Sequence, residues 1–174
     1  TWNNAGGSSY TSSFVFPAGT TIKPCGYLLV AFKWSGSTYT GTDLTTVVTP
    51  DFNVTGAGGV IPFSMSGTKG KVMLSTTCPA NAVACGSEGV TVVDKVAYGS
   101  GATCFETAAA AALTTTTAAV RNGGGMTDND NNSTDFAAVT NPVPHSGISG
   151  YRNPDCLTVP ATTDTWGRVK TLYR

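Results

Sequence analysis

The stretch Gly26-Tyr-Leu-Leu-Val-Ala-Phe-Lys-Trp34 is the strongest apolar run in the chain. It contains aromatic and β-branched residues, and turn-forming residues flank it on both sides. A nine-residue run with this composition is typical of a buried β-strand. It therefore predicts that a sheet, not a helix, organises the core.

Shorter segments on either side of this run have the same character, and stretches rich in Gly, Ser and Pro separate them. They cover residues 14–16, 60–63, 70–75, 90–98 and 118–121. The alternation within 70–75 places Val72 and Leu74 on one face of a strand. Many short, punctuated strands of this kind favour an all-β fold.

Two segments have sequence features that are typical of helices. The five alanines at 108–112 have high helix propensity. However, the run is short and has no amphipathic pattern, so we expect coil or a single turn. Near the C-terminus, Trp166, Val169 and Tyr173 recur at helical spacing, which predicts a short helix over 164–174.

The charge balance excludes several classes of function. Charged residues make up 11% of the chain, and ten basic residues balance ten acidic ones. A nucleic-acid-binding protein would show a basic excess, so we expect no nucleic-acid partner. No apolar run reaches the roughly 18 residues that a membrane-spanning helix requires.

The composition also bears on the compartment. Low charge with abundant Thr, Ser, Gly and Asn is typical of secreted bacterial surface proteins, and five cysteines agree with an oxidising compartment. With one histidine and no CxxC pair, zinc is disfavoured. Because the chain starts at Thr1, we expect a processed protein or a fragment.

Four motifs, in their order along the chain, resemble those of a known protein family. They are FPAGTTIKPCGYLLV (16–30), GTKGKVMLS (67–75), VVDKVAYGSGATCFE (92–106) and TDNDNNSTDF (127–136). Together they resemble the bacterial secreted branch of the lamin-tail domain family. The resemblance implies an immunoglobulin-like β-sandwich. It also implies that one or two strands expected before Trp2 are missing, and Met126 stands where the family often has Cys.

The resemblance divides the chain into two parts. Residues 1–146 are expected to form the lamin-tail-like sandwich domain. Residues 147–174 are expected to form a C-terminal tail, extended at first and then helical. Such domains occur on secreted nucleases, on surface proteins and at the ends of lamins, so the resemblance alone does not define a function.

One acidic loop has the residue types of a cation site. Asp128, Asp130, Asn132 and Asp135 offer oxygen ligands at close spacing, which suits Ca²⁺. The pattern departs from an EF-hand at Ser133, where glycine is expected, and no glutamate follows at the twelfth position. The alternative is an Asx-turn loop whose side chains bind their own backbone. Calcium is the one cofactor that the sequence suggests.

A second polar group belongs to the strands. Asp94 lies on an apolar strand, and a carboxylate there needs a cation or backbone donors. We expect Asp94, Glu106 and Arg121 to form a structural ion-pair group. The lone histidine, His145, lies between Pro144 and Ser146 in an exit loop, where an exposed role is expected. The sequence therefore predicts a non-enzymatic protein.

The five cysteines cannot all pair within one chain. Cys78 and Cys85 lie in one loop and could close a short ring, while a bond between Cys25 and Cys156 would tether the tail. Cys104 is then left free or for pairing between chains. Sequence does not determine this connectivity.

These observations predict a structural, secreted protein of the bacterial cell surface that self-assembles into a filament or related structure. Its contacts are expected at an exposed sheet edge or at apolar residues of the tail, namely Trp166, Val169, Leu172 and Tyr173. The alternatives are an accessory module of a larger secreted enzyme, such as a nuclease, or a surface adhesin domain.

Overall fold

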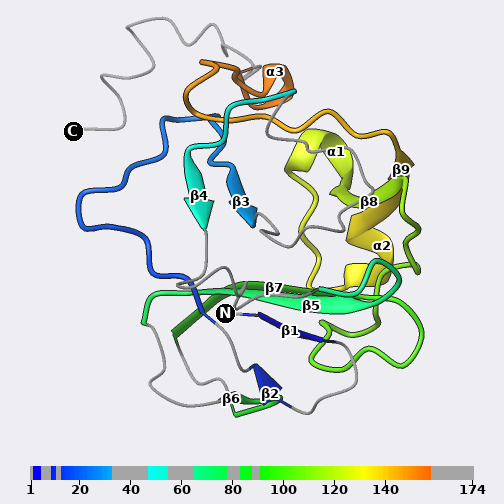
Figure 1. Cartoon of the computed structure of the whole chain (residues 1–174). Coiled ribbons are helices and arrows are strands. Elements are labelled where there is room, and N and C mark those ends of the chain that lie inside the picture. The colour runs from blue at the N-terminus through cyan, green and yellow to red at the C-terminus, as the bar shows by residue number, and fades with distance from the viewer. Residues whose placement is uncertain are drawn as a thin grey trace, which may run out of the picture.

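A computed structural model describes residues 2–4, 9–10, 13–32, 47–54, 65–77, 83–87 and 91–157. Within these ranges the secondary structure is mostly β-strand, with three helices of four residues each (Figure 1). The protein is therefore β-rich, as its composition predicts. None of the helices in these ranges has the length and apolar character to cross a membrane. The predicted strand at 60–63 and helix at 164–174 lie outside the described residues.

A three-stranded antiparallel sheet lies at the centre of the described structure (Figure 1). Its order is β1 (Trp2–Asn4), β5 (Gly70–Ser75) and β7 (Val92–Tyr98). The central strand β5 pairs with both neighbours, so that Val72 lies opposite Trp2 on one side and Val96 on the other. The register shifts between Leu74 and Ser75, which is the signature of a β-bulge.

The predicted alternation in β5 is present, and the buried face is the one that carries Lys71 and Met73. Lys71 and Met73 are 0% and 3% exposed, whereas Val72 and Leu74 are 38% and 47% exposed. A buried lysine needs polar partners. Its Nζ donates to Thr103 Oγ1 at 2.9 Å and lies 5.3 Å from the centroid of the Tyr10 ring.

The first residue of β5 has to be small. A Cβ atom on Gly70 would lie 2.6 Å from Oη of Tyr98, the residue opposite on β7. The buried Tyr98 ring thus occupies the space above Gly70, and its hydroxyl donates to the Ser66 carbonyl at 2.8 Å. This close approach explains why glycine begins the strand.

In the described ranges, three two-stranded pairs accompany the central sheet. The antiparallel pairs are β2 (Ser9–Tyr10) with β6 (Val83–Ala84) and β8 (Thr117–Arg121) with β9 (Phe136–Thr140). The third pair is parallel and joins β3 (Val30–Phe32) to β4 (Phe52–Val54). A long nine-residue strand over 26–34 is not present in the described part of that run.

Side-chain hydrogen bonding explains the short β3. The Leu29 N–H donates to Asp51 Oδ2 at 2.7 Å, while the Leu29 carbonyl accepts from the N–H groups of Asp51 and Phe52. Just before β3 begins, the side chain and backbone of Asp51 therefore make the hydrogen bonds to Leu29 that a neighbouring strand would otherwise make. Phe32 remains 39% exposed, so the run is less buried than its apolar character predicts.

Residues 14–16 form no strand, and Phe14 and Phe16 pack through their rings. The Phe14 and Phe16 ring centroids are 5.1 Å apart, and both rings lie within 5.8 Å of the Phe52 ring on β4. Edge-on and tilted contacts of this kind are favourable between aromatic side chains. They hold the first loop against the β3–β4 pair.

The polyalanine run forms coil, which confirms the prediction. The Ala110 N–H donates to the Ala97 carbonyl at 2.8 Å, and the Ala110 carbonyl accepts from Gly99 N–H at 2.9 Å. Ala110 is thus a single bridge beside the end of β7. Because their side chains are small, Ala97 and Ala102 form a tight cluster there with Ala109.

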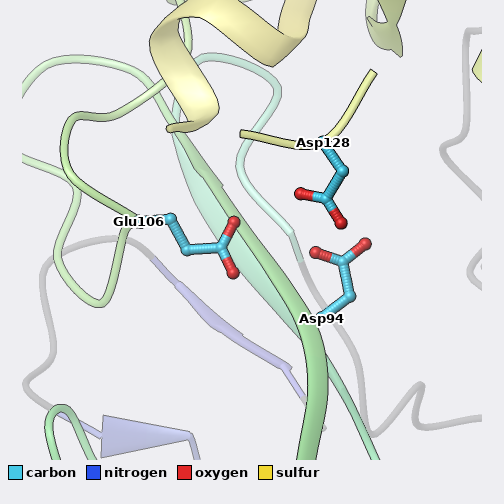
Figure 2. Close-up of side chains that lie close together, drawn as sticks. All are labelled: Asp94, Glu106 and Asp128. Carbon is cyan, nitrogen blue, oxygen red and sulfur yellow. The ribbon is translucent and has the colours of Figure 1, made fainter. Parts of the chain in front are cut away.

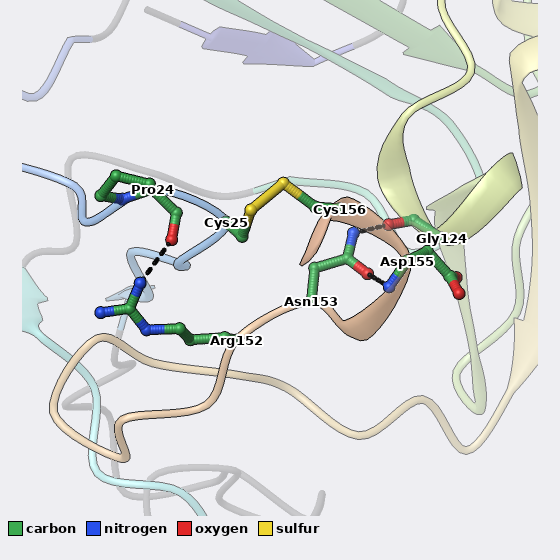
Figure 3. Close-up of a disulfide and its surroundings, with 7 residues drawn as sticks. All are labelled: Pro24, Cys25, Gly124, Arg152, Asn153, Asp155 and Cys156. Carbon is green, nitrogen blue, oxygen red and sulfur yellow. Dashed lines mark hydrogen bonds between the residues drawn. A yellow bond between two sulfur atoms is a disulfide. The ribbon is translucent and has the colours of Figure 1, made fainter. Parts of the chain in front are cut away.

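A disulfide between Cys25 and Cys156 joins the loop before β3 to the C-terminal end of the described chain (Figure 3). Its Cα atoms are 5.6 Å apart, across a sequence separation of 131 residues. Nearby, Asn153 N–H donates to the Cys25 carbonyl, and the Asn153 side chain donates to the Gly124 carbonyl. The half-cystine Cys156 lies in helix α3 (Pro154–Leu157).

The tail predicted from residue 147 is joined to the rest of the chain from its first residues. Asp51 accepts hydrogen bonds from the N–H groups of Gly147 and Ile148, at 2.8 and 3.0 Å. Residues 147–157 consist of a turn, a bridge to Gly26 and helix α3, and are not simply extended. They belong structurally with the preceding residues, which leaves 158–174 as the remainder of the tail.

The second disulfide corrects the sequence-based pairing. Cys85 is bonded to Cys104, with Cα atoms 4.9 Å apart, and not to Cys78. Cys104 is therefore neither free nor available between chains. Cys104 packs beside Tyr10 and Met73 under the central sheet, next to Cys85, which is why this pair meets. Cys78 lies outside the described residues.

Candidate functional site

Three carboxylates from distant parts of the chain meet beside β7 (Figure 2). Asp94 belongs to β7, Glu106 to the loop that follows β7, and Asp128 to the loop after helix α1 (Asn122–Gly125). One oxygen from each lies within 4.8 Å of the others. The sequence placed Asp128 in a different group, because no local spacing links it to Asp94.

Arg121 at the end of β8 supplies the counter-charge. Its Nη2 pairs with Asp94 Oδ2, and its Nη1 lies 3.1 Å from Asp128 Oδ1. The guanidinium also donates to the Thr127 carbonyl and lies 4.5 Å from the centroid of the Phe136 ring. Although burial disfavours its charged form, Asp94 and Asp128 raise the pKa of Arg121 above its ordinary value.

Glu106, the third residue of the predicted ion-pair group, has a different partner. Its Oε2 accepts a hydrogen bond from Asn132 Nδ2 at 2.9 Å. Burial and the negative charge of Asp94 raise the pKa of Glu106, although the bond from Asn132 opposes them. The fold thus disfavours the charged form of Glu106.

Asn132 connects this cluster to the sheet. It is fully buried in helix α2 (Asn132–Asp135), and both ends of its amide are used. Its Oδ1 accepts from the N–H groups of Ala97 and Glu106, while its Nδ2 donates to the Lys95 carbonyl as well as to Glu106. Its side chain therefore binds β7 and the Glu106 loop at once.

The structure does not bring together the four residues predicted to bind Ca²⁺. Asp128 faces Arg121, and the Asn132 amide is engaged at β7. Asp135 is buried and accepts from Asn129 and from the Asn131 N–H, which lowers the pKa of its carboxyl. Asp130 is exposed at a positive φ of 53°. The loop geometry matches the Asx-type alternative, because its side chains bind their own backbone.

The Asp94, Glu106 and Asp128 group has the hard oxygen donors that Ca²⁺ prefers. However, Arg121 already binds two of the three carboxylates. A cation at this position would have to displace the guanidinium or share its ligands. The chemistry that the arrangement supports directly is a structural ion-pair network between β7, β8 and the acidic loop.

We expect Glu106→Gln to raise the free energy of unfolding at pH 7 by about 0.5 kcal/mol. The raised pKa of Glu106 means that the folded state favours its protonated form. The charged form of Glu106 therefore destabilises the folded state at pH 7. This destabilisation disappears as the pH falls from the raised pKa of the folded state to 4.5, the ordinary value for glutamate. Glutamine removes the charge and keeps a carbonyl acceptor for Asn132.

Urea denaturation at pH 7 and pH 4 measures this difference. Asp130→Asn is the matched control, since it removes one negative charge from an exposed position in the acidic loop after helix α1, where this charge raises the pKa of Glu106 less than Asp94 does. An equal change in both variants, or a loss of stability in Glu106→Gln at pH 7, would contradict the assignment.

His145 contacts aromatic rings. Its ring stacks on Tyr151 with centroids 3.6 Å apart and an interplanar angle of 8°, and the Tyr27 ring lies 5.2 Å away. The predicted assembly residues Trp166, Val169, Leu172 and Tyr173 lie outside the described residues.

A scan of protein-family models finds no match to this chain, and searches of curated proteins and of solved structures find none.

Proposed function

We propose that this chain is a non-catalytic structural or interaction protein of the bacterial cell exterior. The observation that carries the proposal is the pair of disulfides, Cys25–Cys156 and Cys85–Cys104. Disulfides persist in oxidising compartments and are rare in the bacterial cytosol. The low content of charged residues agrees with the same location.

The immunoglobulin-like, lamin-tail-like sandwich is part of this proposal. The antiparallel order β1-β5-β7 and the antiparallel β8–β9 pair support it, because such sandwiches are built from antiparallel sheets. The parallel β3–β4 pair is a departure from that pattern. An experimental structure with two packed antiparallel sheets is the expected result.

We further propose that the protein self-assembles. The outward face of the central sheet carries apolar side chains, with Val72 and Leu74 being 38% and 47% exposed. Among the described strands, β1 is an edge of this sheet, and edge strands can pair with another chain. Since residues 147–157 are bound to their own chain, the part of the tail proposed to make contacts between chains is 158–174.

Deletion of residues 158–174 is expected to abolish high-molecular-weight species and to leave a folded core. The deletion preserves the Cys25–Cys156 disulfide and the hydrogen bonds of Asp51, which hold residues 147–157 to the rest of the described structure. Light scattering after size-exclusion chromatography and negative-stain electron microscopy measure the assemblies.

The double variant Trp166→Ser/Tyr173→Ser is the matched test in the full-length chain, and it is expected to weaken assembly. Unchanged assembly after the deletion would refute the role of the tail. A monodisperse full-length monomer at high concentration would refute self-assembly and would favour the accessory-module alternative.

A further inference from the structure

A pocket of about 310 Å³ lies where the N-terminal loop meets the C-terminal segment. Its walls come from residues near Tyr27, from Asp51, and from the turn that precedes Arg152. The Cys25–Cys156 disulfide and the hydrogen bonds of Asp51 hold these segments together. The pocket is therefore built by long-range contacts and does not depend on a single mobile loop.

Among the described residues, the pocket wall carries two cationic side chains and one carboxylate. Lys23 and Arg152 are exposed on its wall, and neither forms an ion pair with any residue in the described ranges. Arg152 Nη1 donates to the Pro24 carbonyl at 2.9 Å, which positions the guanidinium and leaves its other N–H groups for a ligand (Figure 3).

Asp51 does not offset these cations by direct pairing. Its two oxygens accept hydrogen bonds from the backbone N–H groups of Leu29, Gly147 and Ile148. These bonds outweigh the effect of burial and lower the pKa of Asp51. The Asp51 carboxylate thus binds the backbone that forms the wall of the pocket, while the side chains of Lys23 and Arg152 are exposed to solvent.

Two aromatic rings line the same pocket. The Tyr27 and Tyr151 centroids are 5.7 Å apart, and His145 stacks on Tyr151. Tyr151 nevertheless keeps 40% of its surface exposed. A flat, partly exposed aromatic surface suits a ligand that has one apolar face, such as the C–H face of a sugar ring.

We propose that this pocket binds an acidic saccharide, with the uronate carboxylate at Lys23 and Arg152 and the sugar ring against the tyrosines. A planar carboxylate matches the fork of a guanidinium. A phosphate ligand is less well served, because phosphate sites commonly use free backbone N–H groups, and those of Gly147 and Ile148 are taken by Asp51. The proposal goes beyond the structural role and does not depend on self-assembly.

Isothermal titration of the full-length chain with trigalacturonate tests the proposal. We expect saturable binding that is at least tenfold tighter than binding of the neutral galactose trisaccharide, of acetate or of uridine monophosphate. Lys23→Gln and Arg152→Gln are each expected to weaken trigalacturonate binding by roughly tenfold. Tyr151→Ser is expected to weaken binding of the acidic and the neutral sugar by a similar factor.

Lys69→Gln is the matched control, since it removes one positive charge at a position outside the pocket. Thermal denaturation of each variant verifies that it is folded, and exposed Lys23 supplies an independent test if Arg152→Gln disturbs the Pro24 contact. The proposal is overturned by absence of saturable binding at about 10 mM ligand. It is also overturned if Lys23→Gln and Arg152→Gln bind as Lys69→Gln does, or if uridine monophosphate binds more tightly than trigalacturonate.

Discussion

The double variant Cys25→Ser/Cys156→Ser is expected to lose about 5 kcal/mol of its free energy of unfolding. The disulfide spans a sequence separation of 131 residues, so its removal restores a large conformational entropy to the unfolded chain. Hydrogen bonds between Asn153 and Gly124 and between Arg152 and Pro24 continue to hold the C-terminal segment. The variant is therefore expected to fold, with a lower denaturation midpoint.

Guanidinium denaturation under non-reducing conditions measures this loss. Cys78→Ser is the matched control, because Cys78 takes part in neither of the two disulfides and the same chemical change is made. The control is expected to shift the free energy of unfolding by much less than the double variant, because it breaks neither disulfide. Equal midpoints for the double variant and the wild-type protein would show that this disulfide does not constrain the unfolded chain as proposed.

Asn132→Ala is expected to cost about 4 kcal/mol of the free energy of unfolding. Alanine would leave the N–H groups of Ala97 and Glu106 and the carbonyl of Lys95 without their side-chain partner. Each buried polar group that loses its partner costs about 1–3 kcal/mol. The loss should also release the acidic loop from β7, so amide hydrogen exchange in residues 95–106 should accelerate.

Asn131→Ala provides a control at the adjacent position. Asn131 is half-buried and caps helix α2, where its Oδ1 accepts from the Ser133 N–H at 3.2 Å. Loss of such a cap costs about 1 kcal/mol. If Asn132→Ala were no more destabilising than Asn131→Ala, the buried amide would not be the link between the loop and the sheet.

Local features of the sequence were sufficient to predict the class of structure. High Thr and Gly content predicted a β-rich protein, and the alternation at 70–75 predicted the strand β5 with the bounds that the structure shows. The run of alanines at 108–112 was correctly predicted to form coil. These features depend on residues that are neighbours in sequence, where propensity and periodicity act directly.

Side-chain environment in β5 depended on the tertiary structure. Alternation placed Val72 and Leu74 on one face, but burial of the opposite face requires a partner for the Lys71 ammonium. Thr103 and Tyr10 provide that partner from elsewhere in the chain. Similarly, within the described part of the apolar run that begins at Gly26, the strand starts at Val30, because the Asp51 carboxylate binds the Leu29 N–H just before it.

The sequence by itself determined the β-rich class, the location of the strong strand β5 and the concentration of acidic residues in one loop. The tertiary structure decided which of these residues meet. It joined Cys85 to Cys104, directed Asp128 to Arg121 and used Asn132 to bind β7. The physical reason is that spacing along the chain sets local geometry, whereas the partners of a buried charge, amide or thiol are chosen by packing between segments that are distant in sequence.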